Sequence, residues 1–147
     1  MGNPILAQLV RGDLVESIYT GRLVMLDAAG KIEYSQGDIS ELTYPRSAVK
    51  CVQAAVSLEF GASLENETAA IAAASHSGSE AHLEYVRKIL ADVQLTETAL
   101  QTPLDYPLGA AEQRSWIAAG KPKSAIAMNC SGKHAAWINA CVHAGID

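Results

Sequence analysis

The spacing of apolar residues divides the chain into an extended N-terminal part and a helical remainder. In the first forty residues apolar positions alternate or cluster in four short runs separated by glycine-containing turns: 5–12, 14–19, 22–27 and 32–38. Runs of this length between turn residues are typical of β-strands joined by tight turns. The pattern therefore predicts an antiparallel β-meander over residues 1–40, which is too small to be stable unless helices pack on it.

From residue 45 onward the apolar residues recur at helical spacing. The clearest case follows Ser79, a good N-cap residue, after which five apolar side chains fall on one helical face: Leu83, Val86, Ile89, Leu90 and Val93. Helices are also expected after Pro45, after Ser63 as an N-cap, over 110–119 and over 131–143. The helix after Pro45 is apolar almost all round, which predicts that it is buried.

Composition and charge narrow the class of protein. The chain has 147 residues, 49% of them hydrophobic, which suits one modest domain with a real core and argues against disorder. Its formal charge is -5 and it has no basic patch, so nucleic acid is not expected as a partner. We see no signal peptide and no run long enough to span a membrane, and expect no membrane partner. Three cysteines in apolar contexts favour a reducing cytoplasm over a disulfide framework.

The first candidate for chemistry is the pair Ser47 and Lys50. The two residues lie one turn apart at the start of the helix predicted after Pro45. A lysine removed from water holds its proton less tightly, and can then act as a base towards a neighbouring serine. The same spacing also arises from a capping serine followed by a lysine whose charge reaches solvent.

Two further polar segments interrupt the apolar helices. Ser75, His76, Ser77 and Gly78 lie between two predicted helices, where they could serve as caps, or as a second wall of an active site carrying a nucleophile or a proton relay. The segment 129–134 reads Asn-Cys-Ser-Gly-Lys-His at a predicted helix start, which favours the thiolate of Cys130. Cys130 is therefore a candidate nucleophile or metal ligand. The four histidines do not match a known zinc spacing.

Together these segments resemble the asparaginase II family, the inducible rhizobial type. The resemblance is carried by Arg-Ser-Ala-Val-Lys at 46–50, Ala-Ser-His-Ser-Gly at 74–78 and Met-Asn-Cys-Ser-Gly-Lys-His at 128–134, and it covers essentially the whole chain. The opening Leu-Val-Arg-Gly at 9–12 also fits. The resemblance implies an amidohydrolase that converts L-asparagine to aspartate and ammonia. It further implies an α+β fold similar to serine β-lactamases and glutaminases, with N-terminal antiparallel strands followed by a helical cluster.

The resemblance also implies roles for individual residues. The catalytic residues would be Ser47, Lys50 and Ser75, although Ser77 competes with Ser75 for the second serine and either Ser47 or Ser75 could be the nucleophile. The implied substrate-binding residues are Arg46, His76, Asn129 and His134. Cys130 and Lys133 resemble zinc-site residues, which makes zinc a possible cofactor. Family members of full length are expected to be homodimers.

The same comparison predicts that this chain is incomplete. In the family a lysine that pairs with the second serine, and a further cysteine ligand, lie beyond the position of Asp147. We therefore expect residues 1–147 to be a single partial asparaginase-like domain lacking its C-terminal part: a fragment, a truncated product or one piece of an assembly. The alternatives to an asparaginase are an inactive fragment or binding module, and another Ser-x-x-Lys acyl-transfer enzyme. No Ser-Asp-Asn or Lys-Thr-Gly motif supports the latter.

Overall fold

The structure is a computed structural model that describes residues 3–146 and divides the chain into two compact units. The boundary lies between Tyr44 and Pro45, where the sequence changes from predicted strands to predicted helices. The N-terminal unit contains four strands: β1 (Ile5–Arg11), β2 (Leu14–Thr20), β3 (Leu23–Leu26) and β4 (Ile32–Gln36). Short antiparallel strand pairs and helices make the protein a mixed α and β structure, as predicted.

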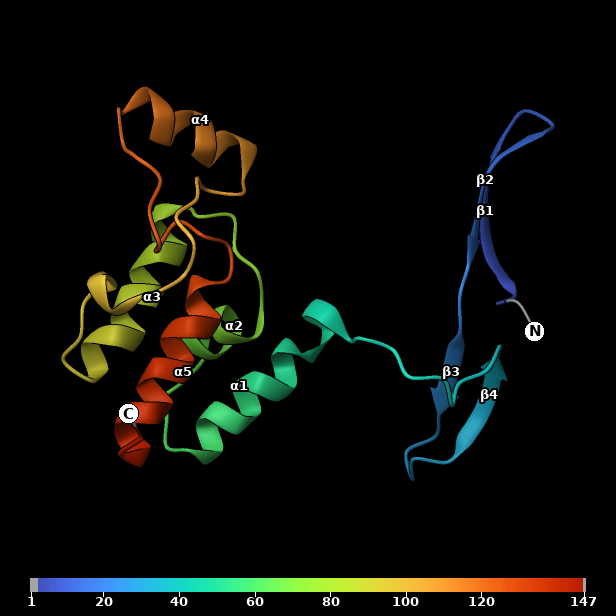
Figure 1. Ribbon diagram of the computed structural model, residues 1–147, viewed down its shortest axis with the longest axis horizontal. Helices are drawn as coiled ribbons and strands as arrows, with labels where there is room; N and C mark the ends of the chain where they lie inside the picture. The colour runs from blue at the N-terminus through green and yellow to red at the C-terminus, as the bar shows by residue number, and fades with distance from the viewer. Residues whose placement is uncertain (1–2, 147) are drawn as a thin grey trace. The chain divides into compact units, whose positions relative to one another are not determined.

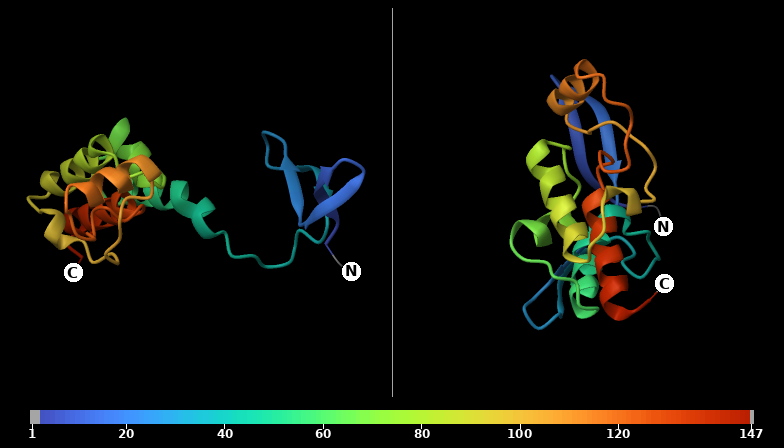
Figure 2. Two further views of the ribbon diagram at one scale, coloured as in Figure 1. Left: turned by 90° about the horizontal axis from the view of Figure 1, so that it is seen from above. Right: turned by 90° about the vertical axis from the view of Figure 1, so that its left-hand side faces the viewer.

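The strands form two separate hairpins rather than the continuous meander that was predicted. β1 pairs with β2 and β3 pairs with β4, both antiparallel, and within residues 3–146 no ladder joins β2 to β3 (Figure 2). β2 ends just before Gly21, whose backbone N–H donates a hydrogen bond to the backbone carbonyl of Pro4. The next residue, Arg22, donates to the carbonyl of Glu41 and to the hydroxyl of Thr43. These contacts turn the chain out of the first sheet.

The helical unit is built around its last helix, α5 (Ser131–Ala144), which contacts three others (Figure 1). These are α1 (Lys50–Glu59), α2 (Glu67–Ala73) and α3 (Glu80–Asp92). Short 3-10 turns lie at Arg46–Val49 and Glu97–Ala99, and α4 (Ala110–Ala118) stands at the edge of the unit (Figure 1). The core is made of buried aliphatic side chains from α3 and α5 above all: Leu83, Val86, Ile89, Leu90, Ala135, Ala136 and Ala140.

The helices differ in how well the sequence predicted them. Ser79 caps α3 by accepting the backbone N–H of His82, and α5 begins at Ser131, so both predictions are confirmed. The expected cap at Ser63 is wrong, because α2 starts four residues later and is preceded by Asn66 in a strained positive-φ conformation. None of the described helices is long and apolar enough to cross a membrane.

The prediction that the first helix is buried on all sides is also wrong. In α1 the buried residues are Lys50, Ala54 and Ser57, which follow one another at helical spacing along the side that packs on α5. Val52 and Val56 are 56% and 44% exposed. A helix that is apolar on every face is fully buried only when a neighbouring element covers each face. Within the helical unit, α1 is covered on one face.

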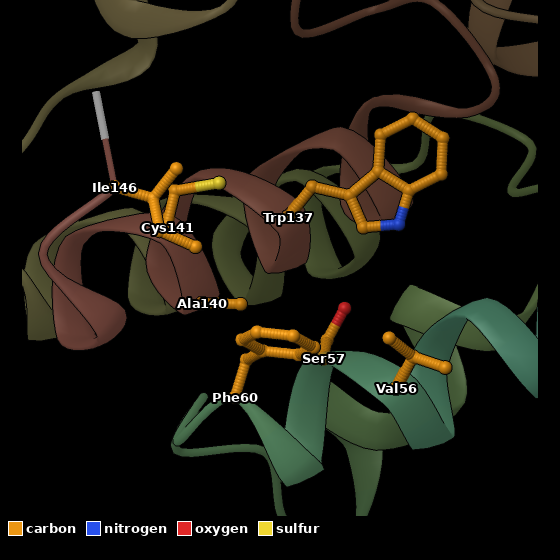
Figure 3. Close-up of a pocket in the computed structure, with 7 residues that line it drawn as sticks. All are labelled: Val56, Ser57, Phe60, Trp137, Ala140, Cys141 and Ile146. Atoms are coloured by element: carbon orange, nitrogen blue, oxygen red, sulfur yellow. The ribbon is translucent and has the colours of Figure 1, made fainter.

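An apolar cavity of about 220 Å³ opens between α1 and α5 (Figure 3). Val56 comes from α1 and Phe60 follows its last residue, whereas Trp137, Ala140 and Cys141 come from α5. No charged side chain lines this cavity. Its only hydroxyl, that of Ser57, donates to a backbone carbonyl within α1. Its Cys141 thiol has no acidic or basic side chain beside it among the lining residues, so the cavity offers no base that would activate a nucleophile.

Candidate active site

Lys50 and Ser75 form a side-chain pair at the junction of α1 and the segment that follows α2. The Nζ atom of Lys50 donates a hydrogen bond to the Oγ atom of Ser75. Lys50 is only 5% exposed, and among the described residues it has no acidic partner. A buried amine without a carboxylate is costly in stability. A buried lysine amine paired with a hydroxyl is therefore more typical of a functional site than of a structural ion pair.

Ser75 is held in place by its neighbour His76. The backbone N–H of His76 donates to the carbonyl of Asn129 at 3.0 Å, and its ring Nε2 lies 2.9 Å from the hydroxyl of Ser131. His76 is 3% exposed and Ser131 is fully buried. The segment after α2 is therefore tied to the start of α5 by two hydrogen bonds, one from the backbone and one from the side chain.

The start of α5 also carries Cys130, whose Sγ atom lies 4.0 Å from the Oγ atom of Ser75. This close approach depends on Gly132. A Cβ atom built on that residue would stand 2.6 Å from the backbone oxygen of Ile71 in α2. The predicted segments around Lys50, Ser75 and Cys130 are thus brought together from three separate parts of the sequence.

Ser47 and Arg46 lie at the edge of this cluster. Both are exposed on the 3-10 turn that precedes α1, and Arg46 has a positive φ of 51°. The backbone carbonyl of Ser47 accepts the N–H of Lys50. A positive φ in a residue with a side chain costs free energy and is often found beside functional sites. In the described part of the chain, the hydrogen bond of the Lys50 amine goes to Ser75 and not to Ser47.

One comparison with known proteins identifies the family of the chain. The model of the family described as L-asparaginase II matches residues 7–147, and this span includes all three polar segments. The chain belongs to the L-asparaginase II family. A search of curated proteins found no match.

The zinc site that the family resemblance implies does not fit the described residues by themselves. A structural or catalytic zinc takes three or four protein ligands, and among residues 3–146 no group of three or more His, Cys, Asp or Glu side chains is placed to hold a metal ion. Cys130 is near Ser75, but the Nζ atom of Lys133 lies 4.4 Å from the centre of the Trp137 ring. That position is typical of a cation–π contact. We therefore derive no chemical step through a metal.

The remaining predicted substrate-binding residues lie at the start of α5. Asn129 is half-buried, and its backbone carbonyl accepts a hydrogen bond from the backbone N–H of His76. His134 packs against Trp137 with ring centroids 5.1 Å apart. Burial, and to a lesser degree the charge of Lys133, lowers the pKa of His134. Asn129 therefore contacts the cluster through His76, and His134 contacts it through its backbone N–H, which donates to the backbone carbonyl of Cys130 at 3.2 Å.

Sequence reasoning missed Ser131 and His82 as parts of the site. Ser131 donates its hydroxyl proton to the carbonyl of Ile126 at 2.8 Å while contacting His76. His82 lies with its ring 5.9 Å from that of His76. Ser131 could have been found from its place between Cys130 and Gly132. From the sequence alone, His82 was treated only as a possible metal ligand. It lies three residues after the Ser79 cap, in the first turn of α3, where its ring is close to that of His76.

The buried imidazole of His76 makes the stability of the protein depend on pH. Desolvation, with smaller contributions from His82 and Lys50, lowers the pKa of His76 from 6.5 to about 4. Between pH 6.5 and pH 4, His76 is therefore protonated in the unfolded chain but not in the folded chain. The free energy of unfolding falls as the pH drops through this range. We expect a loss of roughly 3 kcal/mol across this range.

Urea unfolding at pH 7.5, 6, 5 and 4 measures this dependence. In a His76→Gln variant, which carries no titrating ring, we expect the slope between pH 6.5 and 4 to be much shallower. Other groups that titrate in the same range are unchanged between the two proteins, so the difference between their curves isolates His76. Parallel curves for the two proteins would contradict the assignment.

Proposed function

We propose that this chain carries the Ser-Lys part of an asparaginase active site and hydrolyses the side-chain amide of L-asparagine to aspartate and ammonia. The observation that supports it best is the hydrogen bond from the buried Lys50 amine to the Ser75 hydroxyl. Membership of the L-asparaginase II family supports asparagine as the substrate. The antiparallel strands followed by a helical cluster are compatible with the α+β fold of serine β-lactamases and glutaminases.

In the proposed mechanism, Lys50 in its unprotonated form takes the proton of the Ser75 hydroxyl as Oγ attacks the amide carbon. The carbonyl oxygen becomes negative in the tetrahedral intermediate, and the positive end of α5, which begins beside Ser75, stabilises it. Lys50 then gives its proton to the leaving nitrogen, and ammonia departs. Water, deprotonated by Lys50, hydrolyses the ester to aspartate and restores the serine.

Ser47 is assigned a supporting role in this proposal. Its backbone carbonyl accepts the N–H of Lys50 at the start of α1, and its side chain is exposed. This arrangement favours Ser75 over Ser47 as the nucleophile, because Ser75 holds the hydrogen bond that a base must share with the proton it abstracts.

Ammonia release from L-asparagine tests the proposal. We expect Ser75→Ala to reduce kcat by about 10²- to 10⁴-fold, the range expected when a base or its partner is lost, and Ser47→Ala to have a smaller effect. Thermal unfolding of each variant controls for misfolding. No ammonia from the wild-type chain, or equal rates from wild type and Ser75→Ala, would refute it.

A further inference from the structure

Ser75 lies in residues 74–79, the connection between α2 and α3, which is neither helix nor strand. Without a regular ladder of backbone hydrogen bonds of its own, such a segment is positioned by the groups that it contacts. One anchor is His76, which is hydrogen-bonded to the start of α5. A second anchor is Ser77, and its partners come from a different part of the chain.

That part of the chain is the α4 arm, residues 105–124, which contains α4. Two backbone hydrogen bonds close its base: the N–H of Asp105 donates to the carbonyl of Ser124 at 3.2 Å, and the N–H of Ser124 donates to the carbonyl of Asp105 at 3.0 Å. None of the residues of α4 is buried, and the helix stands at the edge of the unit (Figure 1). Its Trp116 is partly buried and packs on the core. Because α4 buries so little apolar surface, polar contacts carry much of its attachment.

The α4 arm contacts the Ser75 segment at Ser77 and Gly78. The backbone N–H of Gly109 donates to the carbonyl of Ser77 at 2.8 Å. The Ser77 hydroxyl donates to the Oε1 atom of Glu112 at 3.3 Å. Gly78 is buried with a φ of 84°, and a Cβ atom built on it would stand 2.8 Å from the Cβ atom of Pro107. The arm therefore holds Ser77 through both its backbone and its side chain.

Glu112 is itself held in a defined position on the arm. It lies in the first turn of α4, and its carboxylate is so close to Gly109 that a Cβ atom at that residue would clash with it. Trp116 follows four residues later, which places it on the same side of α4 as Glu112. Since Trp116 packs on the core, this side of α4 faces the rest of the unit. Glu112 can therefore act as a fixed hydrogen-bond acceptor for Ser77.

We propose that Glu112 is a positioning residue, which acts through the Ser77 hydroxyl to hold Ser75 against Lys50. The inference rests on the proposed function, because it takes Ser75 as the attacking group. His76 anchors the segment to α5 and Ser77 anchors it to the α4 arm, so both residues that follow Ser75 are fixed. Loss of the second anchor lets the Ser75 hydroxyl move relative to the Lys50 amine. A displacement of about 1 Å at a reacting group can cost about 10²-fold in rate.

The kinetics of ammonia release from L-asparagine test this role. Glu112→Ala should lower kcat by about 10- to 10²-fold and leave KM within about twofold, because the change misplaces the attacking group without removing a contact to substrate. Glu112→Gln keeps a side-chain oxygen that can accept from Ser77, and should retain at least about half of the wild-type kcat. Gln113→Ala is the matched control, because it makes the same truncation at the next, exposed position of α4. It should keep full activity.

Amide hydrogen exchange follows the same anchor without turnover. In Glu112→Ala the amides of residues 75–79 should exchange about tenfold faster than in the wild-type chain, whereas those of α1 should be unchanged. Glu112→Gln should resemble the wild type. Ser77→Ala removes the other half of the hydrogen bond, so adding it to Glu112→Ala should speed exchange little further. Thermal unfolding shows that each variant is folded under the assay conditions.

The positioning role is overturned if Glu112→Ala leaves kcat unchanged, or if Glu112→Gln loses as much activity as Glu112→Ala. It is also overturned if kcat falls while exchange at residues 75–79 does not change, since Glu112 would then act without moving the segment. If the wild-type chain releases no ammonia but Glu112→Ala speeds exchange and Glu112→Gln does not, the anchor stands and the hydrolysis proposal fails alone. If ammonia is released and neither kcat nor exchange responds to Glu112→Ala, the positioning role fails alone.

Discussion

Replacing Lys50 by methionine is expected to abolish most asparagine hydrolysis while leaving the protein folded. The lysine amine is hydrogen-bonded to the Ser75 hydroxyl and is the proposed base, so its loss should lower kcat by about 10²- to 10⁴-fold. Methionine matches the length of the lysine stem and removes a buried amine that has no acidic partner among the described residues. Stability should therefore be unchanged or higher.

The measurement is ammonia release, with urea unfolding of the same samples as the control for folding. Combining Lys50→Met with Ser75→Ala should cost little more than either change alone, because the two groups act as a unit. Lys88, an exposed lysine on α3, offers a comparison, and Lys88→Met should keep full activity. If Lys50→Met retained at least a tenth of the wild-type rate, the dyad would not be the catalytic base and nucleophile.

The sequence predicts the helices well where the evidence for them is local. The apolar spacing of α3 and its Ser79 cap are both determined within one segment, and both agree with the structure. The apolar face of α1 is different, because whether it is buried depends on which neighbours cover it, and those are far away in the sequence. The two hairpins were likewise missed as separate units because pairing between strands is set by contacts outside each strand.

The candidate site likewise combines features that a local pattern identifies with contacts that only the fold determines. The spacing Ser-x-x-Lys identifies Lys50 as a residue of interest, but its hydrogen-bond partner is 25 residues away and is brought close by the packing of α1 and α2. No local pattern could have selected Ser75 over Ser47. The role of Ser131 was also hidden, since it depends on an imidazole 55 positions earlier in the chain.

Gly132 is the residue at which fold and site depend on one another most directly. It lies buried in the first turn of α5, where the backbone of α2 crosses so closely that a Cβ atom would stand 2.6 Å from the carbonyl oxygen of Ile71. That oxygen belongs to the backbone and cannot rotate away. Gly132→Val should therefore push α5 from α2 and cost about 3 kcal/mol or more, at the upper end for an overpacked core residue.

The same displacement would separate Cys130 and Ser131 from Ser75 and His76. We expect Gly132→Val to lose activity even at temperatures where it remains folded, as measured by urea unfolding and ammonia release on one sample. Ala144→Val is the control, because it introduces the same side chain at an exposed position near the end of the same helix. It should cost under about 1 kcal/mol and leave activity intact. Equal stability of the two variants would show that α5 does not need this close approach, and would remove the structural reason for placing Cys130 beside Ser75.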